Sequence, residues 1–421
     1  MLPCGKASPR LELKDPRCPE KLPPMPEAPA FAYIFKRFPV FAQTFVAREI
    51  EGLARHGCEP LIYSLQRPQD AGRQEGFAAL ESRVCTVPSG LRLSTDIIAS
   101  GLAARVSAGV LLSGRWLGRH ARRRREALWL GPRLRAAGVR HIHTHFVGPS
   151  AATAWWLRRD FGFTYSITAH ANDFLSDEEE TPGREALLAD AEFVVAVSDY
   201  SRLLLAEKFP RANIVRVYNG MSLEGFPPRA PVPPPLLVSV GRLVEKKGFG
   251  ILVEVCRRLR DEGVAVRCKI IGDGPLQSDL QTRIDAAGLG GVVELAGAQA
   301  QPEIRAALAA ASAFVLPCVE EKSGGMDILP TVIMEAMAAR LPVVSTTLAG
   351  IPEMVVDGQT GLLVAPGDSV AAAAAVRLLL DNPDKARAMG EAGFRHATSV
   401  FSEDVTIPQL LGLLRAAVRS S

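Results

Sequence analysis

Short apolar segments alternate with amphipathic segments along almost the whole of this 421-residue chain. Apolar runs of about four to eight residues are typical of buried strands, and longer amphipathic stretches are typical of surface helices. Strands that alternate with helices in this way form parallel sheets covered by helices on both faces. The pattern therefore predicts a parallel, doubly wound α/β fold.

The alternation runs in two series that are separated by the stretch FPPRAPVPPP at 226–235, in which six of ten residues are proline. The first series has strand-like segments at 31–35, 60–65, 141–146, 165–170, 193–197 and 213–220, and helix-like segments at 45–57 and 150–159. The second has strand-like segments at 236–243, 266–274, 292–297, 313–317, 342–346 and 361–364, and helix-like segments at 248–262 and 330–340.

A proline-rich stretch between two complete α/β patterns is typical of a semi-rigid linker. We therefore expect a disordered leader at 1–28, an N-terminal domain at 29–225, the linker at 226–235, a C-terminal domain at 236–400 and a final helix at 401–421 that packs back on the N-terminal domain. Two joined open α/β sheets create an interdomain cleft at their carboxyl ends, where such sheets bind ligands.

Composition removes several function classes. The net charge of +4 is modest and gives no indication of nucleic-acid binding. The seven cysteines contain no CxxC pair, which argues against a zinc site or a disulfide scaffold and suits a reducing cytoplasm. The start lacks the apolar core of a secretory signal, and no uncharged apolar run reaches the length of a membrane span.

Basic and acidic residues follow the ends of predicted strands in the second series. VGRLVEKKG places Arg242, Lys246 and Lys247 after a strand, where cations suit a diphosphate, although an ordinary solvated loop has the same composition. The glycines of IGDGP, Gly272 and Gly274, would let backbone approach a flat base, and a plain turn is the alternative. Neither a GxxxxGK[ST] loop nor a GxGxxG fingerprint occurs, which disfavours a nucleotide-dependent oxidoreductase.

The stretch GGMDILPTVIMEAMAARLPVVST contains the most informative acid. Glu335 lies inside an apolar helical pattern, where an unpaired carboxylate costs several kcal/mol, so either it reaches the rim of the core or something specific meets it. Pro330 suits a helix start, and a helix amino terminus favours anions by about 0.3–1 kcal/mol. Asp327 precedes that start. Together the two acids could bracket a ligand rich in hydroxyl groups.

These pieces carry a resemblance. VGRL…KKG, IGDGP, D-x7-E followed by AMA, AGIPE and DGQTGLLVAPGD resemble, in this order over about 236–400, the retaining glycosyltransferases of family 4. In the first half RFPVFAQTFVAREIEGL, HIHTHFVGPSA and TAHANDF resemble the colanic-acid and exopolysaccharide members. The resemblance implies the GT-B architecture, in which two Rossmann-like domains face one another.

On the donor side the resemblance implies that Arg242 and Lys247 grip the diphosphate and that Glu335 holds the ribose. It implies that the backbone around Leu329, Pro330 and Thr331 lies near the phosphates and that Gly272, Asp273 and Gly274 lie near the base. Asp327 falls where the family has a glutamate that contacts the donor sugar, so its shorter reach is expected to move the sugar or narrow donor choice.

On the acceptor side the resemblance assigns His170, with Asp173 beyond it, and more weakly His145. Gln43 stands where the family has an acid, which puts the usual acceptor contact of that acid in doubt. His170, Asp327 and Glu335 are thus the candidate catalytic residues. His141, His143 and His145 share one face of a strand, but the implied fold needs no metal, so neither a metal nor a cofactor is expected.

The implied reaction is transfer from a UDP-, GDP- or other nucleotide-sugar to a saccharide or lipid-linked acceptor in cell-surface or exopolysaccharide biosynthesis. The anomeric configuration would be retained, by front-face attack with the leaving diphosphate as base, and His170 would position a hydroxyl. Two alternatives remain open: a nucleotide-sugar epimerase of the same architecture, and a non-catalytic sugar-nucleotide-binding module.

The segment 114–135, GRWLGRHARRRREALWLGPRLR, joins a run of arginines to two tryptophans and several leucines. A basic helix with aromatic edges is typical of contact with an anionic bilayer, which would suit a lipid-linked acceptor. A solvated helix with a buried stripe is the alternative. We expect a cytoplasmic protein, with peripheral contact to the inner face of the plasma membrane as one interpretation.

Overall fold

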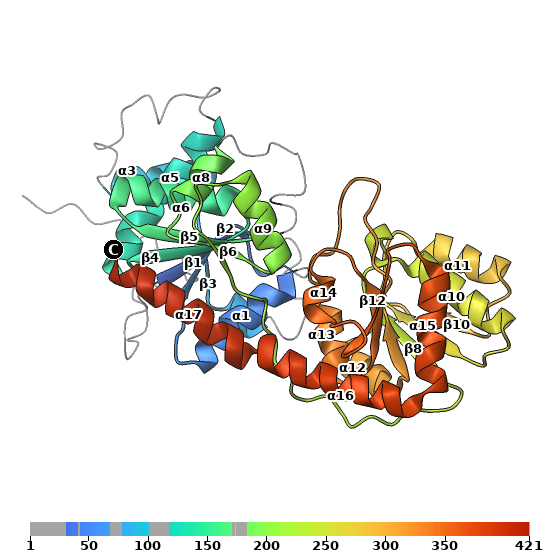
Figure 1. Cartoon of the computed structure of the whole chain (residues 1–421). Coiled ribbons are helices and arrows are strands. Elements are labelled where there is room, and N and C mark those ends of the chain that lie inside the picture. Colours follow the sequence, from blue (N-terminus) through green and yellow to red (C-terminus); the bar gives the residue numbers. More distant parts are fainter. Residues whose placement is uncertain are drawn as a thin grey trace, which may run out of the picture.

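The computed structural model describes residues 31–40, 43–67, 78–100, 118–170, 173 and 183–420, and the leader predicted at 1–28 lies outside them. Two sheets are built from these residues, each in its own domain, with helices around both (Figure 1). Every strand pair in the two sheets is parallel. The predicted α/β fold class is confirmed.

The N-terminal domain contains a seven-stranded sheet in the order β3-β2-β1-β4-β5-β6-β7. Its strands are β1 Phe31–Arg37, β2 Leu61–Gln66, β3 Val84–Thr86, β4 His141–His145, β5 Thr164–Ala169, β6 Val194–Ala196 and β7 Ile214–Arg216. Its helices are α1 Thr44–Arg55, α2 Ala78–Glu81, α3 Gly90–Ala99, α5 Gly118–Ala136, α6 Pro149–Phe161, α8 Arg184–Ala189 and α9 Asp199–Lys208.

The C-terminal domain contains a six-stranded sheet in the order β10-β9-β8-β11-β12-β13. Its strands are β8 Leu236–Val240, β9 Arg267–Ile271, β10 Val293–Leu295, β11 Ala313–Val315, β12 Val343–Thr346 and β13 Gly361–Val364. Its helices are α10 Phe249–Asp261, α11 Gln277–Ala286, α12 Gln301–Ala310, α13 Thr331–Ala338, α14 Ile351–Met354, α15 Ser369–Asp381 and α16 Pro383–Val400.

Strand order places a topological switch point in each sheet. In the first sheet the order reverses between β1 and β4, and in the second between β8 and β11. Crevices that bind ligands form at such points because the loops that follow the two strands run to opposite faces of the sheet. The loops after β8 and β11 carry Arg242 and Asp327. Of the acceptor-side residues predicted from the sequence, Gln43 follows β1 and His145 ends β4, whereas His170 and Asp173 follow β5.

The last helix, α17 Glu403–Arg419, returns from the C-terminal domain and lies along the N-terminal sheet (Figure 1). Its apolar face is buried with Phe31, Tyr33 and Phe193 in one hydrophobic cluster, to which the helix contributes Ile407, Leu410, Leu411, Leu414, Ala417 and Val418. This cover explains why β4 is buried at all five positions although three of them are histidine.

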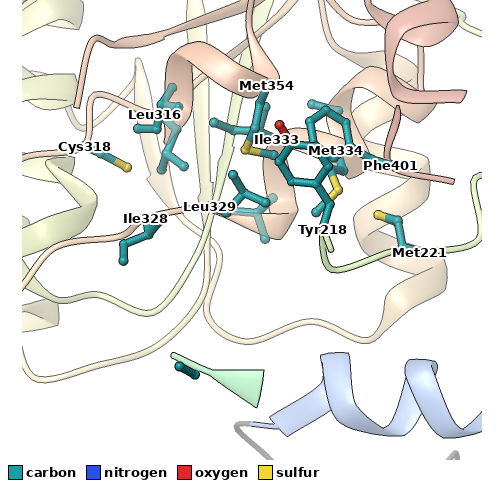
Figure 2. Packing of buried hydrophobic residues seen from close by; sticks show 14 of the residues in the cluster. Tyr218, Met221, Leu316, Cys318, Ile328, Leu329, Ile333, Met334, Met354 and Phe401 are labelled. Carbon is teal, nitrogen blue, oxygen red and sulfur yellow. The ribbon is translucent and has the colours of Figure 1, made fainter. Parts of the chain in front are cut away.

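The chain crosses between the domains at two places. In the linker, Arg229 donates from Nη2 to the carbonyl oxygens of Ala311 and Ser312 at 3.1 and 3.3 Å, which ties the linker to the C-terminal domain. At the second crossing the ring centroids of Tyr218 and Phe401 lie 4.8 Å apart. Figure 2 shows this contact beside Met334 of α13, so apolar packing joins the domains next to the helix that carries Glu335.

Candidate functional site

The loop after β8 holds the cations that we expect to bind a diphosphate. Lys247 Nζ lies 2.6 Å from Asp327 Oδ2, and Lys246 Nζ lies 3.2 Å from Oδ1 of the same carboxylate. Arg242 is exposed and forms no ion pair with any described residue. Two of the three cations are therefore held by an acid of the loop after β11, and the third is accessible to a ligand.

The Asp327–Lys247 pair is charged although it is buried. Burial alone would favour the neutral forms, but the attraction between the two groups outweighs it, lowering the pKa of Asp327 and raising that of Lys247. Their side chains are only 14% and 13% exposed. An anionic ligand that engages Lys247 must therefore compete with Asp327, which is the counter-ion of Lys247 in this loop.

Glu335 is buried in α13 and has a specific partner, so it is not a carboxylate at the rim of the core. Arg48 Nη2, from α1 of the other domain, donates to Glu335 Oε1 at 3.1 Å, and the carboxylate side chain is only 5% exposed. The other oxygen, Oε2, has no hydrogen-bond partner among the described residues. The predicted contact of Glu335 with a donor ribose stays a prediction, and Oε2 is the atom that could make it.

The helix start beside Asp327 differs by one residue from the sequence expectation. Pro330 is the N-cap of α13 and the first helical residue is Thr331, because the extended ψ of 107° at Pro330 does not continue a helix. Leu329 and Pro330 are buried, whereas Thr331 is partly exposed. The free amide groups of the first turn therefore begin at Thr331, on the side of the loop that carries Asp327.

The glycines of the IGDGP loop meet backbone. A Cβ atom added at Gly272 would lie 1.9 Å from the carbonyl oxygen of Gly241, and one at Gly274 would lie 2.6 Å from that of Leu243. Leu243 N also donates to the carbonyl oxygen of Asp273 at 2.7 Å. The glycines therefore allow this loop to pack on the loop that carries the cations, and their predicted place beside a nucleotide base stays a prediction.

Glu353 joins the domains from the C-terminal side. Its carboxylate accepts hydrogen bonds from the backbone N–H groups of Asp199 and Tyr200, at 2.7 and 2.9 Å, and from the hydroxyl of Tyr218 at 2.9 Å. The two N–H groups lie in the first turn of α9, where an anion is favoured. The motif AGIPE thus caps a helix of the opposite domain.

On the acceptor side, His170 follows β5 in an aromatic environment. Its ring lies 4.8 Å from the ring of Phe45 and 4.5 Å from that of Phe146, between centroids. Its backbone N–H donates to Asp173 Oδ2 at 2.8 Å. Burial and, to a smaller extent, His145 lower the pKa of His170 to about 3, so the ring is neutral at pH 7. Burial raises the pKa of Asp173 to about 6.

His145 and His170 belong to a hydrogen-bonded chain that ends on Glu49. His145 Nδ1 lies 3.1 Å from His170 Nε2, and His145 Nε2 lies 3.1 Å from Glu49 Oε1. The hydroxyl of Tyr33 donates to the same oxygen of Glu49 at 2.7 Å. Burial alone would raise the pKa of Glu49, but His145, His143 and Tyr33 outweigh it and lower the pKa to about 2.

The other histidines of β4 have structural partners. His141 and His143 both contact the hydroxyl of Ser166, at 2.8 and 2.7 Å, and their remaining nitrogens contact Thr164 and Thr168 on the same strand. The ligand atoms of Glu49, His143 and His145 also lie within 4.8 Å of one another, a spacing compatible with a cation. The expectation of no metal therefore stays a prediction, which metal analysis of the purified protein would test.

The basic segment at 114–135 is not free to present its apolar side chains to a bilayer where the structure describes it. Leu128 and Trp129 are only 3% and 5% exposed. Arg123 pairs with Glu126 and Arg124 pairs with Asp160, at 2.7 and 2.8 Å. Arg115, Trp116 and Leu117 lie outside the described residues. In the described part of the segment the structure therefore corresponds to the alternative of a helix with a buried stripe.

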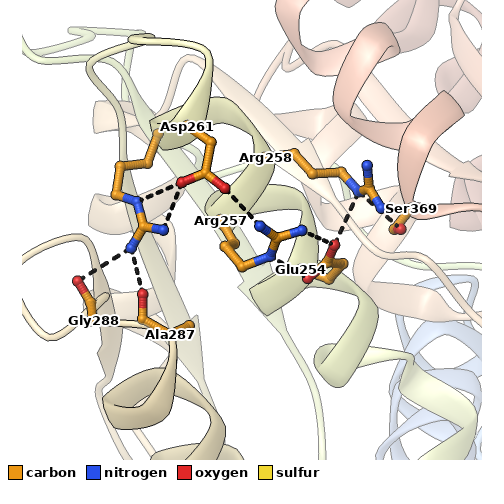
Figure 3. Close-up of polar contacts among 8 residues, drawn as sticks. Glu254, Arg257, Arg258, Asp261, Ala287, Gly288 and Ser369 are labelled. Carbon is orange, nitrogen blue, oxygen red and sulfur yellow. Dashed lines mark hydrogen bonds and ion pairs between the residues drawn. The ribbon is translucent and has the colours of Figure 1, made fainter.

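Charged side chains also gather on α10. Glu254, Arg257 and Asp261 form successive ion pairs along the exposed face of the helix (Figure 3). Ion pairs of this kind on a helix surface contribute only about 0.3–0.5 kcal/mol each. This network is therefore a solvated surface, and it supplies control positions for experiments on the interdomain site.

Gln43 is the residue before α1, and its Oε1 atom is buried without a hydrogen-bond partner among the described residues. The family has an acid at the position of Gln43. In this chain the first carboxylate of α1 is Glu49, more than one helical turn further on. Glu49 was missed as a site residue. Its signal was a carboxylate three residues after Val46 and one before Ile50, both buried in α1.

The comparisons with solved structures define the class of protein. Sucrose-phosphate synthase from Thermosynechococcus elongatus has 20% identity and a TM-score of 0.70, over 93% of this chain and 100% of that chain. Anabaena Alr3699/HepE, solved in complex with UDP-glucose, has 16% identity and a TM-score of 0.66, over 92% of this chain and 99% of that chain. Two Rossmann-like domains that meet at their carboxyl ends make this a protein of the GT-B fold.

Sequence comparison then identifies the family. The model described as Glycosyltransferase Family 4 matches residues 42–224, and the model described as Glycosyl transferases group 1 matches residues 224–396. The GDP-mannose-dependent alpha-(1-6)-phosphatidylinositol monomannoside mannosyltransferase of Mycolicibacterium smegmatis is 32% identical over 289 residues, 63% of this chain and 68% of that protein. The chain belongs to the family 4 glycosyltransferases, as the sequence resemblance predicted.

The similarity also extends to exopolysaccharide enzymes. The putative colanic acid biosynthesis glycosyltransferase WcaL of Escherichia coli (strain K12) is 38% identical over 239 residues, 54% of this chain. The amylovoran biosynthesis glycosyltransferase AmsK of Erwinia amylovora is 42% identical over 138 residues. The match spans 58% of the WcaL protein and 34% of AmsK, less than two thirds of either.

Proposed function

We propose that this protein is a retaining glycosyltransferase that moves a sugar from a nucleotide-sugar to a saccharide or lipid-linked acceptor in exopolysaccharide biosynthesis. The observation that carries the proposal is the 3.1 Å contact between Arg48 and Glu335. This contact joins α1, which also carries Glu49 and so its hydrogen bonds toward His170, to α13, which lies beside the cationic loop. The names of the relatives in colanic acid and amylovoran biosynthesis support the same function.

The donor side supplies charge for a departing diphosphate. Negative charge grows on the leaving oxygen as the anomeric C–O bond breaks, and Arg242, Lys247 and the amide groups at the start of α13 would stabilise it. Glu335 would accept hydrogen bonds from the ribose hydroxyls, and Asp327 would contact the donor sugar. Because protein cations balance the diphosphate, the proposal includes no metal or cofactor, and chelation with EDTA should leave transfer unchanged.

The acceptor side would position the substrate hydroxyl groups. His170, held by His145 and flanked by Phe45 and Phe146, would position the acceptor or the donor sugar through one of its hydroxyl groups. Front-face attack with the diphosphate oxygen as base would retain the anomeric configuration without a protein nucleophile. Replacement of His170 by alanine should therefore lower the transfer rate, and a variant with the full rate would remove this role.

The first experiment identifies the donor. Thermal shifts across UDP-, GDP- and ADP-sugars should pick out one nucleotide, since a ligand at 100 times its dissociation constant adds about 2.7 kcal/mol of stability. Lys247→Ala should abolish the shift, whereas Arg257→Ala, which removes an equal charge from the exposed face of α10, should leave it unchanged. Equal shifts in both variants would contradict the predicted diphosphate site.

The second experiment separates the transferase from the other two interpretations. A transferase releases the nucleoside diphosphate in proportion to an added acceptor. An epimerase would change the sugar of the donor without an acceptor, and a binding module would do neither. Bacterial lipid-linked saccharides and soluble oligosaccharides serve as the acceptor panel, with product anomers read by NMR to test retention.

The cellular place of the reaction belongs to the same proposal. None of the helices in the described part of the chain is long and apolar enough to cross a membrane. We propose a cytoplasmic enzyme with peripheral contact to the inner face of the plasma membrane, where a lipid-linked acceptor would be reached. Liposome flotation at low and high salt tests the contact, and an absence of salt-sensitive binding would remove it.

A further inference from the structure

Two hydrogen bonds connect Glu49 to His170, one between Glu49 and His145 and one between His145 and His170, and each contains one hydrogen. A carboxylate is an acceptor only, and a neutral imidazole has one donor nitrogen and one acceptor nitrogen. The hydroxyl of Tyr33 donates to Oε1 of Glu49 at 2.7 Å, so this oxygen is an acceptor. The 3.1 Å contact of Glu49 Oε1 with His145 Nε2 therefore requires the hydrogen to be on His145 Nε2.

The second link follows from the first. With its single hydrogen on Nε2, a neutral His145 presents a bare Nδ1 atom. The 3.1 Å contact between this Nδ1 and His170 Nε2 then requires His170 to donate, with its own hydrogen on Nε2. His170 Nδ1 is left as an acceptor, and no described residue donates to it.

We propose that Glu49 is a positioning residue which, through His145, holds His170 as the Nε2–H tautomer, so that His170 Nδ1 accepts a hydrogen bond from a sugar hydroxyl of the substrate. The inference rests on the proposed function, in which His170 meets that hydroxyl. Its chemical consequence is directional. The hydroxyl that donates to Nδ1 is one that orients the bound sugar, whereas the attacking hydroxyl gives its hydrogen to the leaving diphosphate.

The surroundings of the chain support a fixed hydrogen arrangement. The titratable groups that face it are Tyr33 on β1, Glu49 on α1, His143 on β4 and Asp173 after β5. Tyr33 donates to Glu49 and thereby stabilises its charged form. The His145 side chain is fully buried and Glu49 is 14% exposed, so water has little access to exchange these contacts.

The decisive variant is Glu49→Gln, which keeps the shape of the side chain but replaces an acceptor by an amide that can donate. The hydroxyl of Tyr33 donates to the same oxygen that His145 contacts, so the amide is introduced together with Tyr33→Phe, which leaves its NH₂ group free to turn to His145 Nε2. The hydrogen of His145 then moves to Nδ1 and that of His170 to Nδ1. The hydroxyl would then face a donor. We expect kcat to fall about a hundredfold, the size of loss that a misplaced substrate can cause, with donor KM and thermal stability little changed.

Tyr33→Phe is the matched control. It removes a hydrogen bond to the same oxygen of Glu49 but keeps the ring that stacks on His145 at 6.0 Å between centroids, so the tautomers of both histidines should be retained. A loss caused by weaker packing around Glu49 would appear in both variants. Rescue is tested with Glu49→Asp, which restores an acceptor with a shorter reach and should recover part of kcat but not raise donor KM.

The tautomer itself is read directly, without turnover. In protein labelled with ¹⁵N in its histidine rings, long-range ¹H–¹⁵N spectra at pH 8 distinguish a bare nitrogen from a protonated one, and His170→Asn assigns the signals. We expect a bare Nδ1 on His170 in the natural sequence and a bare Nε2 when Glu49→Gln is combined with Tyr33→Phe. A protonated Nδ1 on His170 in the natural sequence overturns the proposal even if Glu49→Gln were too unstable for kinetics.

The two proposals fail separately. If no nucleotide-sugar is turned over, the proposed function is lost, while the spectra still decide whether Glu49 sets the tautomer. If transfer occurs and the spectra show His170 protonated on Nδ1, the function stands and the role of Glu49 is lost.

Discussion

Replacement of Asp327 by asparagine tests whether the cationic loop binds a diphosphate. This acid pairs with Lys247 at 2.6 Å and with Lys246 at 3.2 Å. Asp327→Asn keeps the size of the side chain and removes its charge. Lys247, only 13% exposed, is then left without its counter-ion.

The magnitude follows from the burial of the pair. Breaking a fully buried ion pair costs about 3–5 kcal/mol, and an exposed pair contributes about 0–1 kcal/mol. Because both side chains keep some exposure, we expect Asp327→Asn to destabilise the empty protein by about 2 kcal/mol. A bound nucleoside diphosphate would supply a new counter-ion, so most of this cost should vanish in the complex. The nucleotide should then bind about tenfold tighter, equivalent to about 1.4 kcal/mol.

Isothermal titration with the nucleoside diphosphate found in the donor panel measures this difference, and urea unfolding with and without nucleotide gives the same quantity independently. Asp261→Asn is the control, because it removes an acid that pairs with Arg257 on the exposed face of α10 (Figure 3). Equal destabilisation of Asp327→Asn with and without nucleotide, or weaker binding, would refute the placement of the diphosphate. If Asp327 also contacts the donor sugar, transfer slows although binding tightens.

Three further outcomes follow from burial, domain contact and backbone approach. Burial lowers the pKa of His141 to about 3, so between about pH 6.5 and pH 3 the unfolded chain is protonated at His141 and the folded chain is not. The free energy of unfolding should therefore decrease by about 1.4 kcal/mol for each unit by which the pH is lowered in this range. The urea midpoint should fall less between pH 7.5 and pH 5.5 in His141→Phe than in the natural sequence, and an equal fall would contradict this prediction. Glu353→Ala removes three hydrogen bonds to the other domain, including that of Tyr218, and should increase the radius of gyration in small-angle scattering; an unchanged radius would show that apolar packing suffices. Gly272→Ala places a Cβ atom 1.9 Å from a carbonyl oxygen of the cationic loop and should weaken nucleotide binding at least about tenfold. Gly297→Ala is the control, because its Cβ atom meets nothing within 4 Å and should cost only about 1 kcal/mol of stability. Equal nucleotide affinities of the two variants would contradict a role for the close contact between the two loops.

The main elements of the fold could be predicted from the sequence because they depend on local patterns. Apolar runs such as 31–35 and 313–317 became the strands Phe31–Arg37 and Ala313–Val315. The helix start near Pro330 was placed within one residue, since proline constrains its own backbone and lacks an amide hydrogen. Short or polar elements such as Val84–Thr86 were missed, because three residues do not establish a period.

The candidate site divides in the same way. Arg242, Asp327, Glu335 and His170 stand at strand ends or in an apolar helix, and their unusual local settings made them visible in the sequence. Their partners were not visible. Arg48 lies 287 positions from Glu335, and Glu49 lies 96 positions from His145. No local pattern indicates such pairs. The sequence does not show which charged side chains on a helix surface are later covered by another element of the fold.

By itself the sequence determined which segments are buried, which loops carry charge and which family the chain resembles, since propensity, periodicity and motif spacing are properties of neighbouring residues. Only the tertiary structure determined that Lys247 pairs with Asp327 and that Glu335 contacts an arginine of the other domain. It also determined that Glu49 is connected to His170 by hydrogen bonds through His145. The physical reason is that charge and hydrogen-bond direction depend on distances across the fold. Those distances exist only after the two sheets have brought their carboxyl ends together.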